Sequence, residues 1–88
     1  MFKANITITL RPSILDPQGK AMQHALHDLG HASVAQVRAG KHIEMLIEAP
    51  SDAEAEQVAT RACEQLLANA VMEDFVVEVV ELESISAG

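Results

Sequence analysis

Apolar and polar residues alternate over the first eleven positions of the chain. The apolar set is Phe2, Ala4, Ile6, Ile8 and Leu10, and the polar set is Lys3, Asn5, Thr7, Thr9 and Arg11. A period of two places one set on a buried sheet face and the other on an exposed face. The pattern predicts a half-buried strand over residues 2–10.

The segment from Pro17 to Leu29 has the apolar spacing and the ends of a helix. Asp16 is placed to cap the first turn, and Pro17 suits the first helical position, where a missing N–H has no cost. Gly30 is placed to end the helix. We therefore expect the first helix here.

A second helix is predicted after Ser51. Ser51 and Glu54 form a capping-box pattern, in which each side chain caps the backbone of the other. The apolar residues expected on its buried face are Ala55, Val58, Ala59, Ala62, Cys63, Leu66 and Leu67. Asn69 is expected to stop the helix in a left-handed conformation.

Three further segments have strand character: 33–38 weakly, 42–48 clearly, and 75–82. The order is then β-α-β-β-α-β, which predicts an α+β two-layer sandwich with two helices on one face of a mostly antiparallel four-stranded sheet. We expect one domain over residues 1–83 and a flexible tail over residues 84–88. Between the two middle strands, Gly40 is expected to form a tight turn with a positive φ.

The segment 75–82 is apolar on both sides of the predicted strand. One side carries Phe75, Val77 and Val79, and the other carries Val76, Val80 and Leu82. Two helices cover only one sheet face, so the second row needs another cover, and a second copy of the chain is the simplest one. The alternative is that the valines reflect β propensity with partial exposure.

Composition narrows the classes of function. The chain has 88 residues, of which 49% are hydrophobic, and a net charge of −7. An acidic surface repels nucleic acid, and no apolar run is long enough for a membrane span or a signal peptide. The single cysteine, Cys63, excludes an internal disulfide and fits a reducing cytosol. We expect a cytoplasmic protein.

Few residues suggest chemistry of their own. His24, His27 and His31 share one helix face, but ligands spread over two turns rarely converge on one metal ion, so a polar stripe is favoured. Cys63 lies among apolar residues and is expected to be a small buried thiol. Glu73-Asp74 is interpreted as a solvated strand entry. We therefore predict no catalytic, cofactor-binding or metal-binding residue on this chain.

Several blocks of the chain resemble the PurS subunit family of phosphoribosylformylglycinamidine (FGAM) synthase. They are Leu15-Asp16-Pro17-Gln18-Gly19, His24-Ala25-Leu26, Val37-Arg38-Ala39-Gly40-Lys41 with Glu44, and Cys63-Glu64-Gln65-Leu66-Leu67-Ala68-Asn69 running on to Glu73-Asp74-Phe75. The resemblance covers nearly the whole chain. It departs from the family at Phe75, where a Tyr is common.

The resemblance implies a non-catalytic accessory subunit in de novo purine biosynthesis. The complex converts formylglycinamide ribonucleotide (FGAR) to FGAM with ATP, Mg²⁺ and glutamine. ATP and Mg²⁺ act on the synthetase subunit, PurL, and the glutaminase subunit, PurQ, releases ammonia. PurS, as a homodimer or a tetramer, is implied to bridge the two and to assist ammonia transfer, with no cofactor of its own.

Arg38, Gly40 and Lys41 are the residues that we expect at a partner interface. Basic side chains at a turn of an acidic chain suit carboxylates of a partner subunit. The alternative is a plain solvated hairpin. A different function also remains open, because an ACT-like domain that senses a small molecule shares the order of elements.

Overall fold

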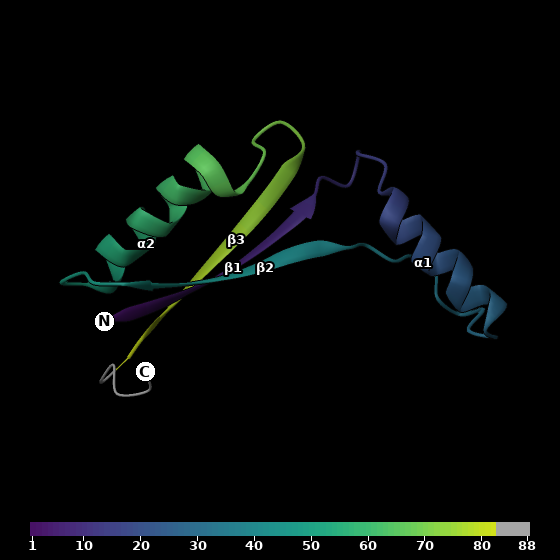
Figure 1. Cartoon of the computed structure of the whole chain (residues 1–88), viewed down its shortest axis with the longest axis horizontal. Helices are drawn as coiled ribbons and strands as arrows, with labels where there is room; N and C mark the ends of the chain where they lie inside the picture. The colour runs from purple at the N-terminus through teal and green to yellow at the C-terminus, as the bar shows by residue number, and fades with distance from the viewer. Residues whose placement is uncertain (83–88) are drawn as a thin grey trace.

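The computed structural model describes residues 1–82, so the tail predicted for residues 84–88 lies outside the described part. The elements, in order, are β1 (Phe2–Leu10), α1 (Pro17–Asp28), β2 (Gly40–Ile47), α2 (Asp52–Ala62), the π-helical turn η1 (Cys63–Leu67) and β3 (Glu73–Glu81) (Figure 1). Within residues 1–82, no helix has the length and apolar character needed to cross a membrane. The α+β class with an antiparallel sheet is confirmed.

The sheet has the strand order β2-β1-β3, and both pairings are antiparallel. Ile6, at the centre of β1, lies opposite Ile43 of β2 and Val77 of β3. The alternation in β1 therefore aligns with apolar positions on both neighbours. Because β1 is central, β2 and β3 are the edge strands of the described sheet, each with one side unpaired.

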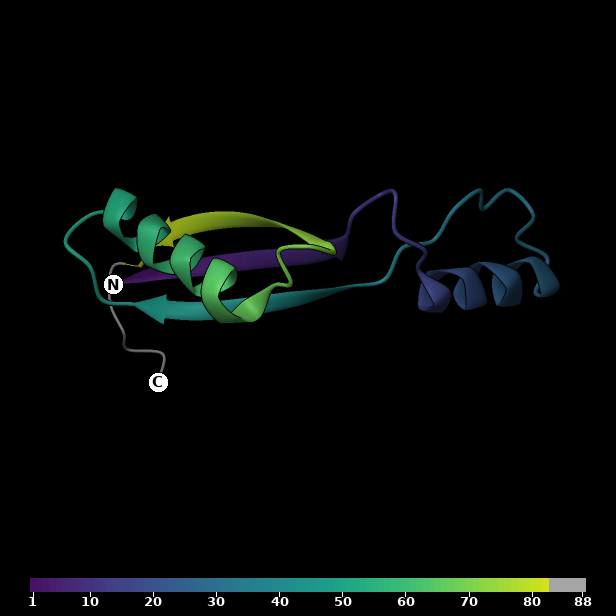
Figure 2. The same cartoon turned by 90° about the horizontal axis from the view of Figure 1, so that it is seen from above.

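Helix α2 and η1 cover one face of this sheet (Figure 2). Ala55, Ala59 and Cys63, spaced by four residues, are fully buried and join Ile6 and Ile8 in the core. Small side chains let the helix lie close to the strands, which completes the burial of the isoleucines. The predicted helix face is partly wrong, since Val58 and Leu66 are 47% and 81% exposed.

The fourth strand predicted at residues 33–38 is absent, and this segment runs beside α1 instead. Its carbonyl groups lie within hydrogen-bonding distance of α1 side chains. The Gln23 side-chain amide donates to the carbonyl of Ala35 at 3.1 Å, and Nε2 of His27 lies 2.7 Å from the carbonyl oxygen of Val34. A segment bound to helix side chains in this way does not join the sheet.

Helix α1 does not lie on the sheet, which corrects the prediction of two helices on one face. Residues 11–39, called here the α1 arm, extend beyond the ends of the strands, and α1 makes no substantial contact with another element (Figures 1 and 2). The radius of gyration is 16.7 Å, whereas a compact domain of this length has about 12 Å. Of the residues of α1, only Gly19 is buried.

The ends of α1 are those that the sequence predicts. The Asp16 side chain caps the first turn, with Pro17 at the first helical position. Gly30 has a φ of 98°, and its N–H donates to the carbonyl of His27, while the N–H of His31 donates to that of Leu26. These two bonds are the Schellman pattern that ends many helices.

Asn69 ends the second helical segment differently from the prediction. No described residue other than glycine has a positive φ. The Asn69 side-chain oxygen instead accepts hydrogen bonds from the N–H groups of Val71 and Met72, at 3.0 and 3.2 Å. The side chain thereby forms the turn into β3 without a left-handed residue.

Candidate functional site

The two motifs Leu15–Gly19 and Val37–Lys41 lie side by side where the α1 arm joins the sheet. The carboxylate of Asp16 connects them: Oδ1 accepts the N–H of Gly19 and Oδ2 accepts the N–H of Ala39, both at 2.9 Å. The N–H of Gly19 lowers the pKa of Asp16 most, followed by that of Ala39, and the charge of Arg38 adds to the effect. One carboxylate thus binds the start of α1 to the residue that precedes β2.

Gly19 allows the backbones of these two motifs to touch. A Cβ atom on Gly19 would lie 2.2 Å from the carbonyl oxygen of Val37. No other residue fits there without a shift of the backbone. The first turn of α1 therefore packs directly on the chain that leads into β2.

Arg38 is bound inside the chain. Its guanidinium donates from Nη2 to the carbonyl oxygen of Leu10, the last residue of β1. The side chain thus crosses from the segment before β2 to the segment that leaves β1. The guanidinium is thus engaged within the chain, and the partner contact predicted for Arg38 stays a prediction.

Gly40 and Lys41 belong to β2 and not to a tight turn, so the predicted turn is wrong. Gly40 pairs with Thr9, and within residues 1–82 the only positive φ is that of Gly30. Lys41 is 60% exposed, and its Nζ lies 3.9 Å from a carboxylate oxygen of Glu73. Of the three predicted partner residues, Lys41 alone presents a largely accessible charged group.

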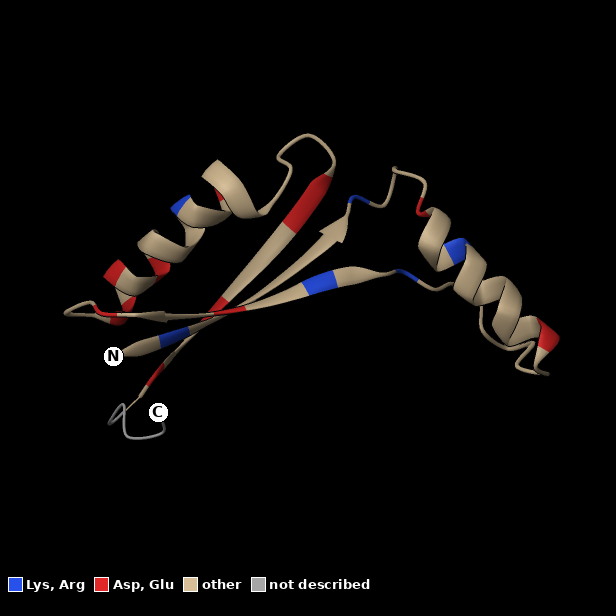
Figure 3. Cartoon of the chain, in the orientation of Figure 1, with Lys and Arg blue, Asp and Glu red and all other residues tan. Residues whose placement is uncertain are grey.

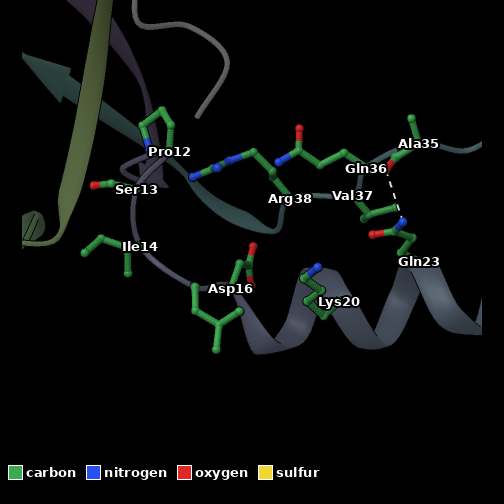
Figure 4. A pocket seen from close by; sticks show the side chains of 11 residues that line it. Pro12, Ser13, Ile14, Asp16, Lys20, Gln23, Ala35, Gln36, Val37 and Arg38 are labelled. Atoms are coloured by element: carbon green, nitrogen blue, oxygen red, sulfur yellow. Dashed lines mark hydrogen bonds between the residues drawn. The ribbon is translucent and has the colours of Figure 1, made fainter.

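A hollow of about 580 Å³ lies beside this junction, between the connecting segments 12–16 and 35–38 and the first turns of α1 (Figure 4). Lys20 and Arg38 contribute basic groups to its lining, and Asp16 contributes a carboxylate. All of its lining belongs to the α1 arm. The hollow is therefore a property of the way in which the arm is attached.

The predicted dimer residues lie on the sheet face that α2 leaves open. Val76, 67% exposed, lies beside Thr7, and Val80, 42% exposed, lies beside Lys3. Leu82 follows the end of β3 and is half-buried, and its N–H donates to the carbonyl of Met1 at 2.8 Å. The structure thus places the two valines on one uncovered surface.

Leu46 belongs to the same surface, although the sequence analysis did not single it out. It is 62% exposed and lies on the other side of Lys3 from Val80. The sequence does hint at this exposure, because Leu46 is the one apolar residue between Glu44 and Glu48 on the polar side of the predicted strand. Lys3 forms an ion pair with Glu44 on this face, and its hydrogen bond lowers the pKa of that carboxyl.

The other candidates for chemistry have structural roles. Within residues 1–82, no group of three or more His, Cys, Asp or Glu is placed to hold a metal ion. Cys63 is buried, and desolvation raises the pKa of its thiol, with the charge of Glu64 adding to the effect. Oδ1 of Asp74 forms an ion pair with Nε of Arg11 at 3.4 Å, and the Glu73 carboxylate is the partner of Lys41. The described residues provide no activated nucleophile.

Charge is distributed unevenly between the α1 arm and the rest of the chain. The arm carries three basic and two acidic residues, whereas residues 1–10 and 40–82 carry three basic and ten acidic ones. Figure 3 shows basic residues on both connections between α1 and the sheet, and acidic residues along α2 and the strands. The molecule therefore presents an acidic body and a weakly basic, histidine-containing arm.

Comparison with known proteins shows which family shares these features. The family model "PurS: Phosphoribosylformylglycinamidine (FGAM) synthase" matches residues 3–81. The PurS subunits of FGAM synthase from Synechocystis and Bacillus subtilis are 49% and 45% identical to this chain; each match covers 93% of it, and 82% and 96% of the respective relatives.

Solved structures agree with the sequence comparison. B. subtilis PurS superimposes with a TM-score of 0.82 at 46% identity, covering 92% of this chain and all of that one. Methanocaldococcus jannaschii PurS gives 0.87 at 32% identity, covering 94% of this chain and all of the other. A chain in the structure of PurLQS from Thermotoga maritima gives 0.83 at 32% identity, covering 90% of this chain and 96% of that one.

Proposed function

The chain belongs to the PurS family of FGAM synthase subunits, and from this membership we propose that it is the non-catalytic accessory subunit of such a complex. In this role it bridges the glutaminase subunit, PurQ, and the synthetase subunit, PurL, for the conversion of FGAR to FGAM in purine biosynthesis. The subunit names in the T. maritima PurLQS structure support this assignment of partners. Membership in this family takes the place of the ACT-like alternative.

The observation that carries the proposal is the extended shape of the chain. The chain has 88 residues and a radius of gyration of 16.7 Å, and within residues 1–82 one helix and one sheet face are uncovered (Figure 2). Such a shape has little interior for an active site but a large surface for contacts. It suits a subunit whose work is to hold other subunits in place.

A homodimer is the simplest form in which the proposed subunit is stable. The exposed Met22 of α1, the exposed Leu29 that follows this helix, and the exposed Leu46, Val76 and Val80 of the sheet require cover. The opposite charge balance of arm and body favours contact between the arm of one copy and the body of another. Small domains commonly gain their missing burial in this way, as dimers or as tetramers.

The chemistry of the reaction is assigned to the partners. ATP and Mg²⁺ act on the synthetase subunit, and this chain holds no cofactor of its own. Ammonia must pass between two active sites without loss to water, and a bridging subunit assists by sealing the interface between them. The proposed compartment is the cytoplasm, where a single buried thiol such as that of Cys63 stays reduced.

The proposed partner contact now rests on Lys41. Arg38 is hydrogen-bonded to Leu10, and Gly40 is paired within the sheet. Lys41 lies at the end of the sheet nearest the arm and is mostly exposed, so its ammonium group is available to a carboxylate of a partner subunit.

Reconstitution of the reaction tests the proposal. The chain alone is expected to have no glutaminase, ATPase or synthetase activity. Addition of the chain to the PurL and PurQ subunits of the same organism is expected to raise the glutamine-dependent rate of FGAM formation, while the rate with free ammonia changes little. Equal glutamine-dependent rates with and without the chain would contradict the accessory role.

A further inference from the structure

Two separate chain segments within the α1 arm connect α1 to the sheet. The first, residues 11–16, leaves β1 after Leu10 and enters α1 at Pro17, and the second, residues 29–39, runs from the end of α1 into β2 at Gly40. Since α1 itself makes no substantial contact with the sheet, these connections alone determine where the arm points. Two unsupported connections of this kind would act as hinges.

Each connection carries one charged side chain that binds across the junction. Asp16, on the first, accepts the N–H of Ala39 on the second. Arg38, on the second, donates to the carbonyl of Leu10, the last residue of β1, from which the first connection leaves. The two hydrogen bonds therefore form a reciprocal cross-link between segments that are 23 and 28 residues apart in the chain.

The backbone contact at Gly19 closes the same junction from the side of the helix. Because the Gly19 Cα lies against the carbonyl of Val37, the first turn of α1 cannot slide along the second connection without separating from it. A change in the direction of the arm would have to stretch or break these two cross-links. Hydrogen bonds to charged groups are the stronger ones in proteins, and here both involve one.

We infer that Asp16 and Arg38 are positioning residues that fix the direction of the α1 arm before the chain associates with a partner. Neither residue touches a reacting group, and each acts through the arm. A preset direction lowers the conformational freedom lost on association. The role in assembly rests on the function proposed above, whereas the fixed direction is a property of the chain alone.

The direction of the arm is measurable by distances between two spin labels on one chain. Labels are placed at His24→Cys on α1 and at Gln57→Cys on α2, both exposed positions, and native Cys63 is retained because it is buried. Labelled chains are diluted into excess unlabelled chains, so that only distances within one chain are recorded. Wild type is expected to give one narrow distribution.

The test variants are Arg38→Met and the double variant Asp16→Asn with Arg38→Met. Arg38→Met removes the bond to Leu10 and leaves the cap of α1 intact. Gly19 and Ala39 donate to different oxygens of Asp16, and in Asn an NH2 group, which cannot accept, replaces one of these oxygens. The matched control is Lys20→Met with Asp28→Asn, which likewise removes one basic and one acidic charge, at exposed positions of the arm for which no ion pair or side-chain hydrogen bond is seen within residues 1–82. Circular dichroism checks that the helices remain.

The distance distribution is expected to broaden in Arg38→Met, to broaden further in the double variant, and to match wild type in the control. The double variant is also expected to bind the PurL and PurQ subunits about tenfold more weakly, the factor that loss of about one such hydrogen bond produces. An unchanged distribution in both test variants overturns the fixed direction. A broadened distribution with unchanged affinity overturns its role in assembly.

The two proposals fail in different measurements. If wild type does not bind the PurL and PurQ subunits, the proposed function is wrong, and the distance distributions still test the inference. If wild type binds but the distance distributions of the two test variants are as narrow as that of wild type, the inference is wrong and the proposed function stands.

Discussion

The backbone of Gly40 passes so close to that of Ile8 that a Cβ atom on Gly40 would lie 2.5 Å from the carbonyl oxygen of Ile8. The two residues come from paired strands, and the nearest atom is part of the backbone. A side chain at position 40 therefore meets backbone first, and Cγ2 of Thr9, at 2.9 Å, is the next nearest atom. The glycine is required by the approach of two strands and not by its φ.

Gly40→Ala is expected to destabilise the chain by about 1–3 kcal/mol, since the added methyl group forces the start of β2 away from β1. Denaturant unfolding at one fixed protein concentration measures the change. His42→Ala, at an exposed position of the same strand, is the control and is expected to change stability by no more than about 0.5 kcal/mol. Equal effects of the two substitutions would show that the close approach has no energetic weight.

Arg38 and Lys41 are expected to respond differently to removal. Arg38→Ala leaves the partly buried carbonyl of Leu10 without its donor and should lower stability by about 1–3 kcal/mol. Lys41→Ala removes a long ion pair, 3.9 Å from Nζ to the Glu73 carboxylate, whose ammonium group is mostly exposed, and should change stability by less than about 1 kcal/mol. Binding of the partner subunits is expected to weaken on Lys41→Glu, and unaltered binding would remove Lys41 from the proposed interface.

Val76→Lys is expected to weaken association between copies of the chain, because it places a charge on the open sheet face. Sedimentation at a series of concentrations measures the change in the dimer dissociation constant. The matched control is Val58→Lys on α2, another valine that is about half exposed. The open face is not the contact surface if both variants dissociate at the same concentration, or if wild type is a monomer at micromolar concentration.

The junction is expected to loosen in acid. The pKa of Asp16 is lowered in the folded chain, so the carboxylate contributes stability that is fully present above its unfolded pKa of about 3.9. That contribution is lost as the pH falls from this value through the lower folded pKa. The protection of the Gly19 and Ala39 amides against exchange, relative to an unfolded chain at the same pH, should therefore fall below about pH 4. In Asp16→Asn this acid step should be absent.

Local patterns predicted the parts of the fold that depend on neighbours in the sequence. The alternation of β1 gave its buried face correctly, because Ile6 and Ile8 are fully buried. Asp16 and Gly30 marked the ends of α1, since caps act within one turn. These signals need no knowledge of the rest of the chain.

The errors concern residues whose roles depend on distant parts of the chain. Residues 33–38 have strand character, but Gln23 and His27 bind their carbonyl groups. Gly40 has the character of a turn residue, but the structure requires glycine there because the backbone of Ile8 lies so close. Arg38 has the character of a surface residue, but its guanidinium donates a hydrogen bond to Leu10. Pairings across 28 residues leave no local periodicity from which to predict them.

The near absence of burial along α1 has a consequence for the supply of this subunit. A helix that buries only Gly19 in its own chain opens readily, and opened segments are where proteases cut. A single unassociated copy therefore exposes its arm to degradation, whereas a copy in the proposed dimer or complex would have the arm covered. In a cell that makes more of this chain than its partners bind, proteases would degrade the surplus copies, beginning at the arm. The stoichiometry of the complex would then depend on cleavage as well as on synthesis.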